Sequence, residues 1–266
     1  MSAPTSSRLR GEGSILCRAV APLVVLPVLI GAWYALKAVS GLPDYVIPGP
    51  KGVLLALHEH RATLLKATIY TTKAAACGLG VSLALGMPIA LVLSLSRTLR
   101  AGIFPYLTLL QTVPIVAVAN AVIIALGHGF PSIVCISASM GLFPVIASTL
   151  SGLTSVDPRL LELFQLHNAS LWKTWTKLRL PSAVRDLASG AKIAAGLSST
   201  GAVVGEYFVG SEPDRFGLAY IIYESSRNVR ADLMYAATAA AIVLGISLFA
   251  ALGFVESVIL ARWSRR

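Results

Sequence analysis

Six long apolar runs constrain this chain more than any other feature of its sequence. Each approaches or exceeds the roughly 20 residues that an α-helix needs to cross a bilayer core of about 30 Å. Only helices and closed barrels satisfy their backbone polar groups inside lipid, and uninterrupted runs of this length favour helices. We therefore predict an all-α, polytopic membrane protein with about six transmembrane helices and one transmembrane domain, residues 1–266. The runs are residues 19–38, 67–95, 103–126, 130–152, 190–210 and 233–258.

The composition supports a membrane protein and excludes several other classes. The residues AVILMFWYC make up 56% of the chain and charged residues only 13%, against about 25% charged in a typical soluble domain. Cys17, Cys77 and Cys135 all lie in apolar stretches, which indicates neither a disulfide framework nor a metal site. The 22 basic residues outnumber the 12 acidic ones, but they are scattered between the apolar runs, so no nucleic acid is expected as a partner.

The basic residues instead predict the orientation of the chain. With both termini in the cytoplasm, 14 of the 22 lysines and arginines lie on the inner side. The positive-inside rule favours this arrangement. It places residues 153–189, the longest polar stretch, in the cytoplasm, and residues 39–66, 127–129 and 211–232 outside.

The cytoplasmic segment 153–189 begins with a short predicted helix. Asp157 followed by Pro158 is typical of an N-cap and a first helical position. Apolar residues then recur at three- and four-residue spacing as far as His167. Asn168 tolerates the left-handed conformation that commonly ends a helix. We therefore expect this helix to end near Asn168.

A second short helix is predicted directly afterwards. Ser170 can cap it, its tryptophans and leucines form one face, and its lysines lie on another. We expect it to end before Pro181, because the residue before a proline disfavours helical angles. Such an elbow could be a connector anchored at the lipid headgroups or a docking surface for another protein, and the helical pattern alone leaves both open.

The residues of this elbow resemble the EAA motif in the permease subunits of binding-protein-dependent ABC importers. Glu162-Leu163-Phe164, Asn168-Ala169-Ser170, Leu180-Pro181 and Gly190-Ala191-Lys192 follow the order and spacing of that motif. The resemblance covers most of the chain and is closest to the nitrate, taurine and sulfonate class. It is carried also by Pro48-Gly49-Pro50, Gly86-Met87-Pro88, Gln111-Thr112-Val113-Pro114, Gly127-His128-Gly129, Phe143-Pro144, Glu206 and Phe216-Gly217-Leu218.

The resemblance implies a type I importer permease in the bacterial plasma (inner) membrane. A dimer of separate ABC ATPase subunits would bind ATP and magnesium, an extracytoplasmic binding protein would deliver a small anionic or aromatic solute, and a second permease copy would complete a homodimer. The chain departs from the family pattern at Phe164, Asn168, Asn120 and Ala125. The implied ATPase-coupling residues are Glu162, Leu163, Gln165, Leu166, His167, Asn168, Ala169 and Ser170.

Polar residues inside the apolar runs are candidates for the translocation pathway, because such groups are costly in lipid and tend to face the bundle interior or a water-filled cavity. Gln111 and Asn120 could instead form hydrogen bonds between helices, and Lys73 could extend to the interface. Glu206 is either a pathway or gate residue or an interfacial charge. The predicted pathway set is Gln111, Pro114, Asn120 and Glu206.

No sequence motif indicates that this chain is an enzyme. It has no Gly-x-x-x-x-Gly-Lys-[Ser/Thr] loop for nucleotide phosphates and no Gly-x-Ser-x-Gly. We therefore expect no cofactor in this chain and ATP hydrolysis on a partner. The alternative is a secondary transporter or channel that acts without an ATPase; such folds commonly contain internal repeats, which we do not find in this sequence.

Overall fold

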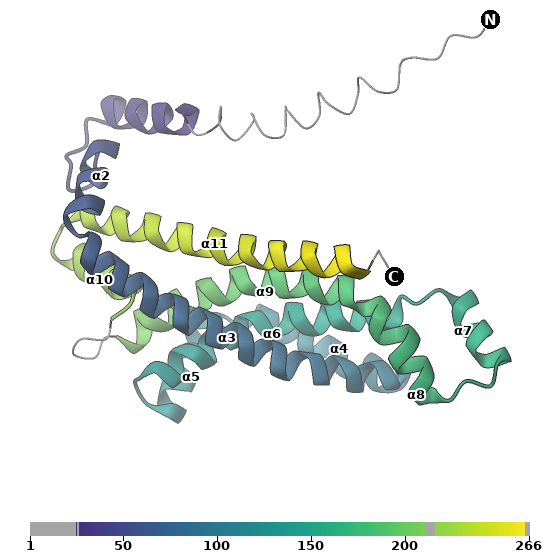
Figure 1. Cartoon of the computed structure of the whole chain (residues 1–266). Helices are drawn as coiled ribbons and strands as arrows, with labels where there is room; N and C mark the ends of the chain where they lie inside the picture. Colours follow the sequence, from purple (N-terminus) through teal and green to yellow (C-terminus); the bar gives the residue numbers. More distant parts are fainter. Residues whose placement is uncertain (1–24, 26, 211–215, 264–266) are drawn as a thin grey trace, which may run out of the picture.

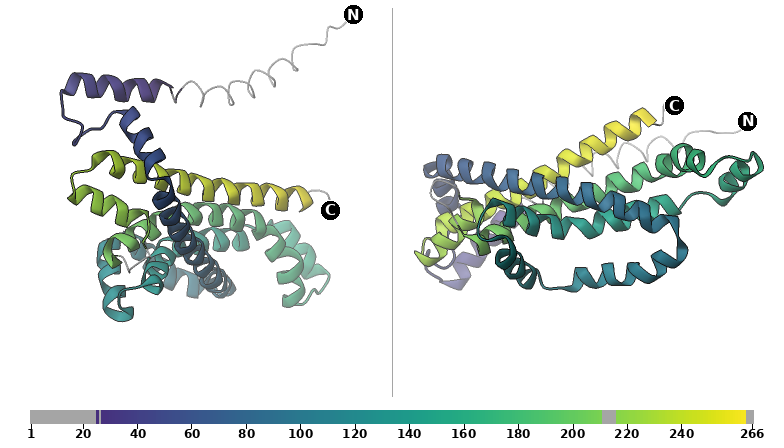
Figure 2. Two further views of the ribbon diagram at one scale, coloured as in Figure 1. Left: turned by 60° about the vertical axis from the view of Figure 1, so that its left-hand side comes forward. Right: turned by 90° about the horizontal axis from the view of Figure 1, so that it is seen from below.

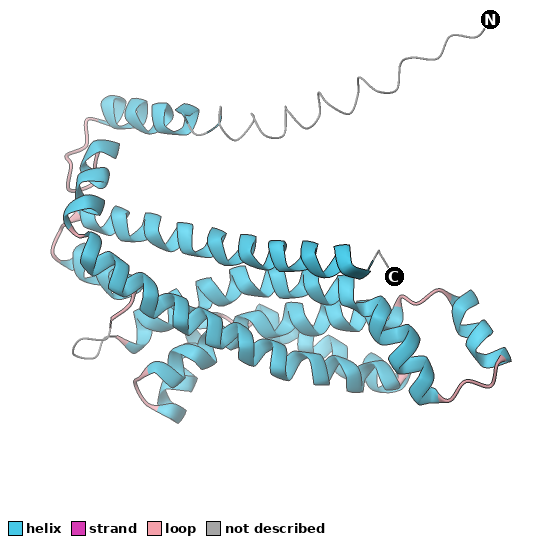
Figure 3. Ribbon diagram, viewed as in Figure 1, coloured by secondary structure: helices cyan, strands magenta, loops and turns pink. Residues whose placement is uncertain are grey.

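The structure is a computed structural model that describes residue 25 and residues 27–210 and 216–263. In this part of the chain the regular elements are all helical, and Figure 3 shows no strand among the described residues. The all-α prediction is confirmed. The helices (Figure 1) are Pro27–Ser40, α2 Pro50–Glu59, α3 Arg61–Leu95, α4 Arg97–Thr112, α5 Ile115–Leu126, α6 Phe130–Thr154, α7 Pro158–Leu166, α8 Leu171–Thr174, η1 Trp175–Arg179, α9 Leu180–Val209, α10 Leu218–Arg227 and α11 Ala231–Trp263.

Three described helices are long and apolar enough to cross a membrane. They are α3, α6 and the part of α11 from Ala231 to Val258. They contain or closely match the predicted runs 67–95, 130–152 and 233–258. The predicted run 103–126 differs from a simple span, because it is divided into α4 and α5, which meet at an angle of 95°.

Two other predicted spans are less regular than expected. Helix α9 begins at Leu180 and so extends well before the predicted start at residue 190, and Arg185, Asp186 and Lys192 make its first half polar. The helix Pro27–Ser40 covers most of the predicted first span. Residues 19–24 of that span and Cys17 lie outside the described residues. By length and composition alone, the described part contains three spans, or four if the bent pair is one.

The core of the molecule is a layer in which α3, α6 and α9 lie side by side. Small residues allow this close approach, as is usual where helices pack inside a membrane. A Cβ atom on Gly141 of α6 would lie 2.5 Å from Ser198 Oγ of α9 and 2.7 Å from Ser82 Oγ of α3. A Cβ atom on Gly201 would lie 2.8 Å from the Cα atom of Ser137. No larger side chain fits at these two contacts.

Hydrogen bonds between the same helices reinforce the layer. The Ser82 hydroxyl donates to the carbonyl oxygen of Ala138 at 2.8 Å, and the Ser137 hydroxyl donates to that of Ser198 at 2.8 Å. All four residues lie on the buried helix faces, where water cannot compete for these groups. Serines therefore join α3 to α6 and α6 to α9.

Apolar side chains also cover the outside of the molecule. On α11, Ile242, Val243 and Ile246 are each about 60% exposed, and lipid is the environment in which a row of this kind is stable.

Different helices lie at the two ends of the layer of α3, α6 and α9. Helices α7 and α8 lie at the same end as the C-terminal end of α11, whereas α2, α5 and α10 lie at the opposite end (Figures 1 and 2).

Candidate functional site: an exposed elbow and a membrane cavity

Helix α7 is stabilised by local interactions at both of its ends. The Asp157 side chain accepts a hydrogen bond of 2.9 Å from the backbone N–H of Arg159, and Pro158 occupies the first turn. At the other end Asn168 has φ 47°, and the N–H groups of Asn168 and Ala169 donate to the carbonyls of Gln165 and Phe164. This is a Schellman motif with asparagine at its left-handed position. The predicted start and end of this helix are confirmed.

The apolar face of α7 is uncovered. Leu160 is 43%, Leu163 47% and Leu166 80% exposed, and Figure 1 shows α7 standing apart from the bundle. The predicted coupling residues Glu162, Gln165, His167, Asn168 and Ser170 are also exposed, while Ala169 is half-buried. A rigid nine-residue helix with a bare leucine face is therefore presented at one end of the molecule.

From Leu171 onward, the polypeptide continues from the elbow into the core as one uninterrupted helical run. The Ser170 hydroxyl accepts a hydrogen bond from the N–H of Lys173, as predicted for a cap. The expectation that the second helix ends before Pro181 is wrong. Proline clashes with the carbonyl four residues earlier in an α-helix, but here Trp175–Arg179 widens into a π-helical turn that accommodates it. The elbow is thus joined directly to α9.

A cavity of about 510 Å³ lies between the α4–α5 arm and helix α6. Its lining includes Leu107 and Gln111 of α4 and Ser139, Met140 and Phe143 of α6. Figure 2 shows α4 and α5 departing from the layer on this side. The residues that line the cavity carry no formal charge, so it suits a solute with apolar faces and a few polar groups.

The bend between α4 and α5 produces this cavity. Val113 precedes a proline and has an extended conformation, φ −66° and ψ 126°, as expected for a residue in that position. Pro114, with ψ 124°, then precedes the first turn of α5. The structure therefore brings Gln111 to the cavity and Pro114 to the bend beside it, between the lining residues Val113 and Ile115.

The other two predicted pathway residues lie elsewhere. Asn120 is exposed on α5 and does not line the cavity beside α4. Glu206 is 1% exposed and lies near the opposite end of α9 from the elbow. Its carboxylate faces the start of α10 rather than this cavity, and its participation in a pathway stays a prediction.

Glu206 and Thr71 together hold the first turn of α10. Glu206 Oε2 accepts a hydrogen bond of 3.2 Å from the N–H of Ala219, and Thr71 Oγ1 accepts one of 3.0 Å from the N–H of Leu218. These N–H groups have no partner within their own helix. A Cβ atom on Gly217 would overlap the Glu206 carboxylate. Glycine at this position therefore lets α9 provide the cap of α10.

Sequence reasoning did not identify Thr71, Ser139 or Met140 as site residues. They are ordinary residues of apolar helices, and their positions depend on which helices become neighbours. The spacing of polar residues along one helix carries no signal for such contacts. Phe143 and Gly217 were noted only as parts of family motifs, and their roles follow from the cavity and from the Glu206 carboxylate.

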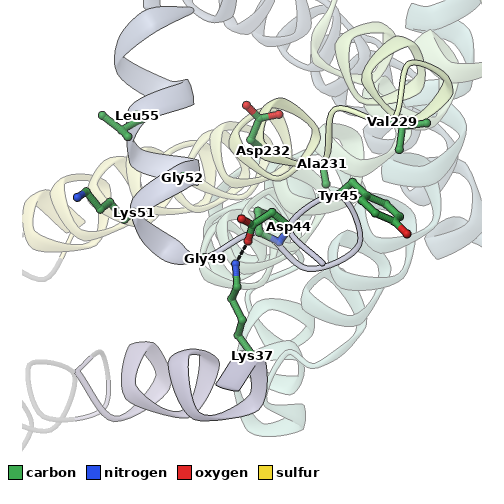
Figure 4. A pocket seen from close by; sticks show the side chains of 11 residues that line it. Lys37, Asp44, Tyr45, Gly49, Lys51, Gly52, Leu55, Val229, Ala231 and Asp232 are labelled. Carbon is green, nitrogen blue, oxygen red and sulfur yellow. Dashed lines mark ion pairs between the residues drawn. The ribbon is translucent and has the colours of Figure 1, made fainter. Parts of the chain in front are cut away.

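A second pocket lies at the end opposite α7, where the helix Pro27–Ser40, α2 and the start of α11 meet (Figure 4). It has a volume of about 480 Å³. Lys37 forms an ion pair with Asp44 beside it, and Lys51 and Asp232 also line it. This surface is therefore polar and carries both signs of charge, in contrast to the uncharged cavity beside α4.

The cap of α10 gives a testable consequence. Gly217→Ala should lower the stability of the fold by about 1–3 kcal/mol, because the added Cβ displaces the Glu206 carboxylate. Gly102→Ala is the control, since nothing lies within 4 Å of a Cβ atom there. The double variant Gly217→Ala with Glu206→Ala should be less destabilised than the sum of the two single variants. The melting temperature in detergent is measured for the Gly217→Ala, Gly102→Ala and Glu206→Ala variants and for the double variant. Equal melting of the Gly217→Ala and Gly102→Ala variants would contradict the described contact.

Comparisons with known proteins place these features in a family. Residues 82–263 match the model of the family described as "Binding-protein-dependent transport system inner membrane component". A probable ABC transporter permease of Haemophilus influenzae is 32% identical over 87% of this chain and 93% of its own length. The riboflavin transport system permease of Chloroflexus aurantiacus is 28% identical, over 90% and 88%. A putative aliphatic sulfonates transport permease of Bacillus subtilis is 25% identical, over 87% and 80%.

The family match includes the second half of α3 from residue 82, the α4–α5 arm, the elbow and all of α11, so it covers both the cavity and the exposed helix. The helical fold, the apolar spans and the relatives agree with the resemblance to the nitrate, taurine and sulfonate class. This chain belongs to the family of inner membrane components of binding-protein-dependent transport systems, the permeases of ABC importers.

Proposed function

We propose that this chain forms the translocation pathway of an ATP-driven importer and couples it to a separate ATPase. The observation that carries the proposal is α7, which is capped at both ends and has an exposed leucine face. The turn at residues 167–170 connects it to the continuous helical run of α8, η1 and α9. An exposed apolar face on a rigid helix outside the bundle is typical of a surface that another protein covers. In this proposal a dimer of ATPase subunits, which bind ATP and magnesium, receives α7 in a groove.

The cavity beside α4 supports a proposal about the solute. Its lining has hydrogen-bonding groups on Gln111 and Ser139 and apolar surface on Met140 and Phe143, with no cation to bind a sulfonate. One relative is named for riboflavin and another for aliphatic sulfonates. We favour a small heteroaromatic solute, because its flat faces and polar edge match this lining. A second permease copy would close the open side of the cavity in a homodimer.

The proposed orientation places the elbow in the cytoplasm and the pocket of Figure 4 outside. The excess of basic residues toward the elbow supports it. The outer end, with Lys37, Asp44, Lys51 and Asp232 around one pocket, is then the surface on which a solute-binding protein docks. Its mixed charges suit the polar rim of a reversible protein interface.

Cysteine labelling tests this orientation. In a variant without Cys17, Cys77 and Cys135, a cysteine at Lys173 should react with a membrane-impermeant reagent only after the cells are opened, and a cysteine at His128 should react in intact cells. Lys173 lies in α8 and His128 in the turn between α5 and α6, and both residues are exposed. Labelling of position 173 in intact cells would reverse the proposed topology.

Coupling through the elbow is tested at its left-handed turn. Asn168→Pro should lower uptake per ATP hydrolysed by about tenfold or more, because proline cannot adopt φ 47° and lacks the N–H that donates to Gln165. Asn168→Gly is the matched control, since glycine adopts this conformation freely. Glu162→Ala should have a smaller effect, as expected at the rim of an interface.

The assay uses the permease reconstituted with its ATPase and binding protein, and it measures solute uptake and hydrolysis in the same vesicles. Full coupling in the Asn168→Pro variant would make the elbow a passive connector. Uptake that persists without any ATPase would instead favour a secondary transporter or channel.

Filling the cavity tests the pathway. Leu110→Trp should reduce uptake by about tenfold or more, because Leu110 lines the cavity. Leu109→Trp should leave uptake unchanged, because Leu109 does not line the cavity. Both leucines are about 60% exposed on the same helix. Uptake of a labelled pyrimidine or flavin is compared with uptake of taurine. Transport of taurine alone, or equal activity of the two tryptophan variants, would contradict the proposal.

A further inference from the structure

An ion pair joins α9 to α11 close to the elbow. Lys192 Nζ lies 2.6 Å from Glu256 Oε2, and the hydroxyl of Ser189 donates to Glu256 Oε1 at 3.1 Å. Both carboxylate oxygens therefore have a partner. This cluster of Ser189, Lys192 and Glu256 belongs neither to the exposed elbow nor to the cavity beside α4.

The two helices present matching faces at this contact. Arg185, Ser189 and Lys192 are four and three residues apart, which puts them on one face of α9. Arg185 adds a further positive charge near the Glu256 carboxylate. Phe249 of α11 lies on the same side as Glu256, and the Lys192 ammonium lies 5.5 Å from the centre of its ring. The lysine is thus held by a carboxylate and an aromatic ring of a single helix.

The surroundings make this pair hard to separate. The side chains of Lys192 and Glu256 are only 27% and 13% exposed, and Glu256 lies within the part of α11, Ala231 to Val258, that is apolar and long enough to cross a membrane. A charged group without a partner is costly there. Separating α9 from α11 at this level would leave both charges without their partners, so the two helices are favoured to remain together.

The cluster also compensates for weak packing of α11 at this end. Leu244 is the last described residue of α11 that is fully buried. Toward the opposite end, α11 is held by an apolar cluster that includes Ala236, Ala237 and Leu218. Beyond Leu244 the described side chains are half-buried or exposed. The contact with Ser189 and Lys192 therefore anchors this half of α11 to α9.

The place of the cluster along α9 gives it a role. Residues from Leu171 to Val209 form one continuous helical run, through α8, η1 and α9, so a displacement of the elbow is transmitted to Ser189 and Lys192. We propose that Lys192, Ser189 and Glu256 form a clip that makes α11 move with α9 when the ATPase displaces the elbow. They are positioning residues for coupling, and the inference rests on the proposed importer function.

Exchange of the two charges tests the clip. Lys192→Met or Glu256→Gln should lower uptake per ATP hydrolysed by about fivefold or more. The double variant Lys192→Glu with Glu256→Lys should restore the ratio to within about twofold of the original protein, because it rebuilds the pair in reverse. Lys66→Met is the control for the loss of one positive charge, since Lys66 is exposed on α3.

The readout separates coupling from simple anchoring. The complete transporter, with ATPase and binding protein in vesicles, is measured for uptake, hydrolysis and thermal unfolding. A normal uptake-to-hydrolysis ratio in Lys192→Met overturns the clip, even if its melting temperature falls, because anchoring alone changes stability and not the ratio. A double variant that folds but stays uncoupled also overturns it. Failure of the importer proposal itself is recognised differently, as an original protein whose uptake does not depend on ATP.

Discussion

The close contact of α3, α6 and α9 through small residues is the constraint on which the rest of this structure depends. Gly141 and Gly201 occupy positions where a Cβ atom would meet a neighbouring helix at 2.5 to 2.8 Å. Apolar helices gain little from one another in lipid beyond packing and hydrogen bonds, so shape decides which helices become neighbours. The cavity, the cap of α10 and the clip to α11 all arise on the outer faces of this layer.

Helix α9 connects the functional parts of the molecule. It begins at the π-helical turn behind the elbow, packs against α6, and carries Lys192 toward α11. In its last turn, Glu206 contacts the start of α10. At about 1.5 Å per residue its 30 residues extend about 45 Å, more than the thickness of a bilayer core. One rigid helix therefore links the end with the exposed elbow to the opposite end of the bundle.

Much of the fold could be predicted from the sequence because its signals are local. Apolar runs located α3, α6 and α11, and Asp157-Pro158 with Asn168 located both ends of α7. Predictions failed where a local preference was overridden. The helix continues through Pro181 because a π-helical turn accommodates the ring. The site residues Thr71 and Lys192 act through contacts between distant parts of the chain, for which one sequence without its fold carries little signal.

The central claim is that this permease moves its solute only when an ATPase acts on the elbow. The direct measurement is solute accumulation in vesicles that contain the purified permease and its binding protein, with and without the ATPase and ATP, at zero ion gradient. The account predicts accumulation only when the ATPase and hydrolysable ATP are both present. Accumulation by the permease alone, driven by an imposed proton or sodium gradient, would contradict it.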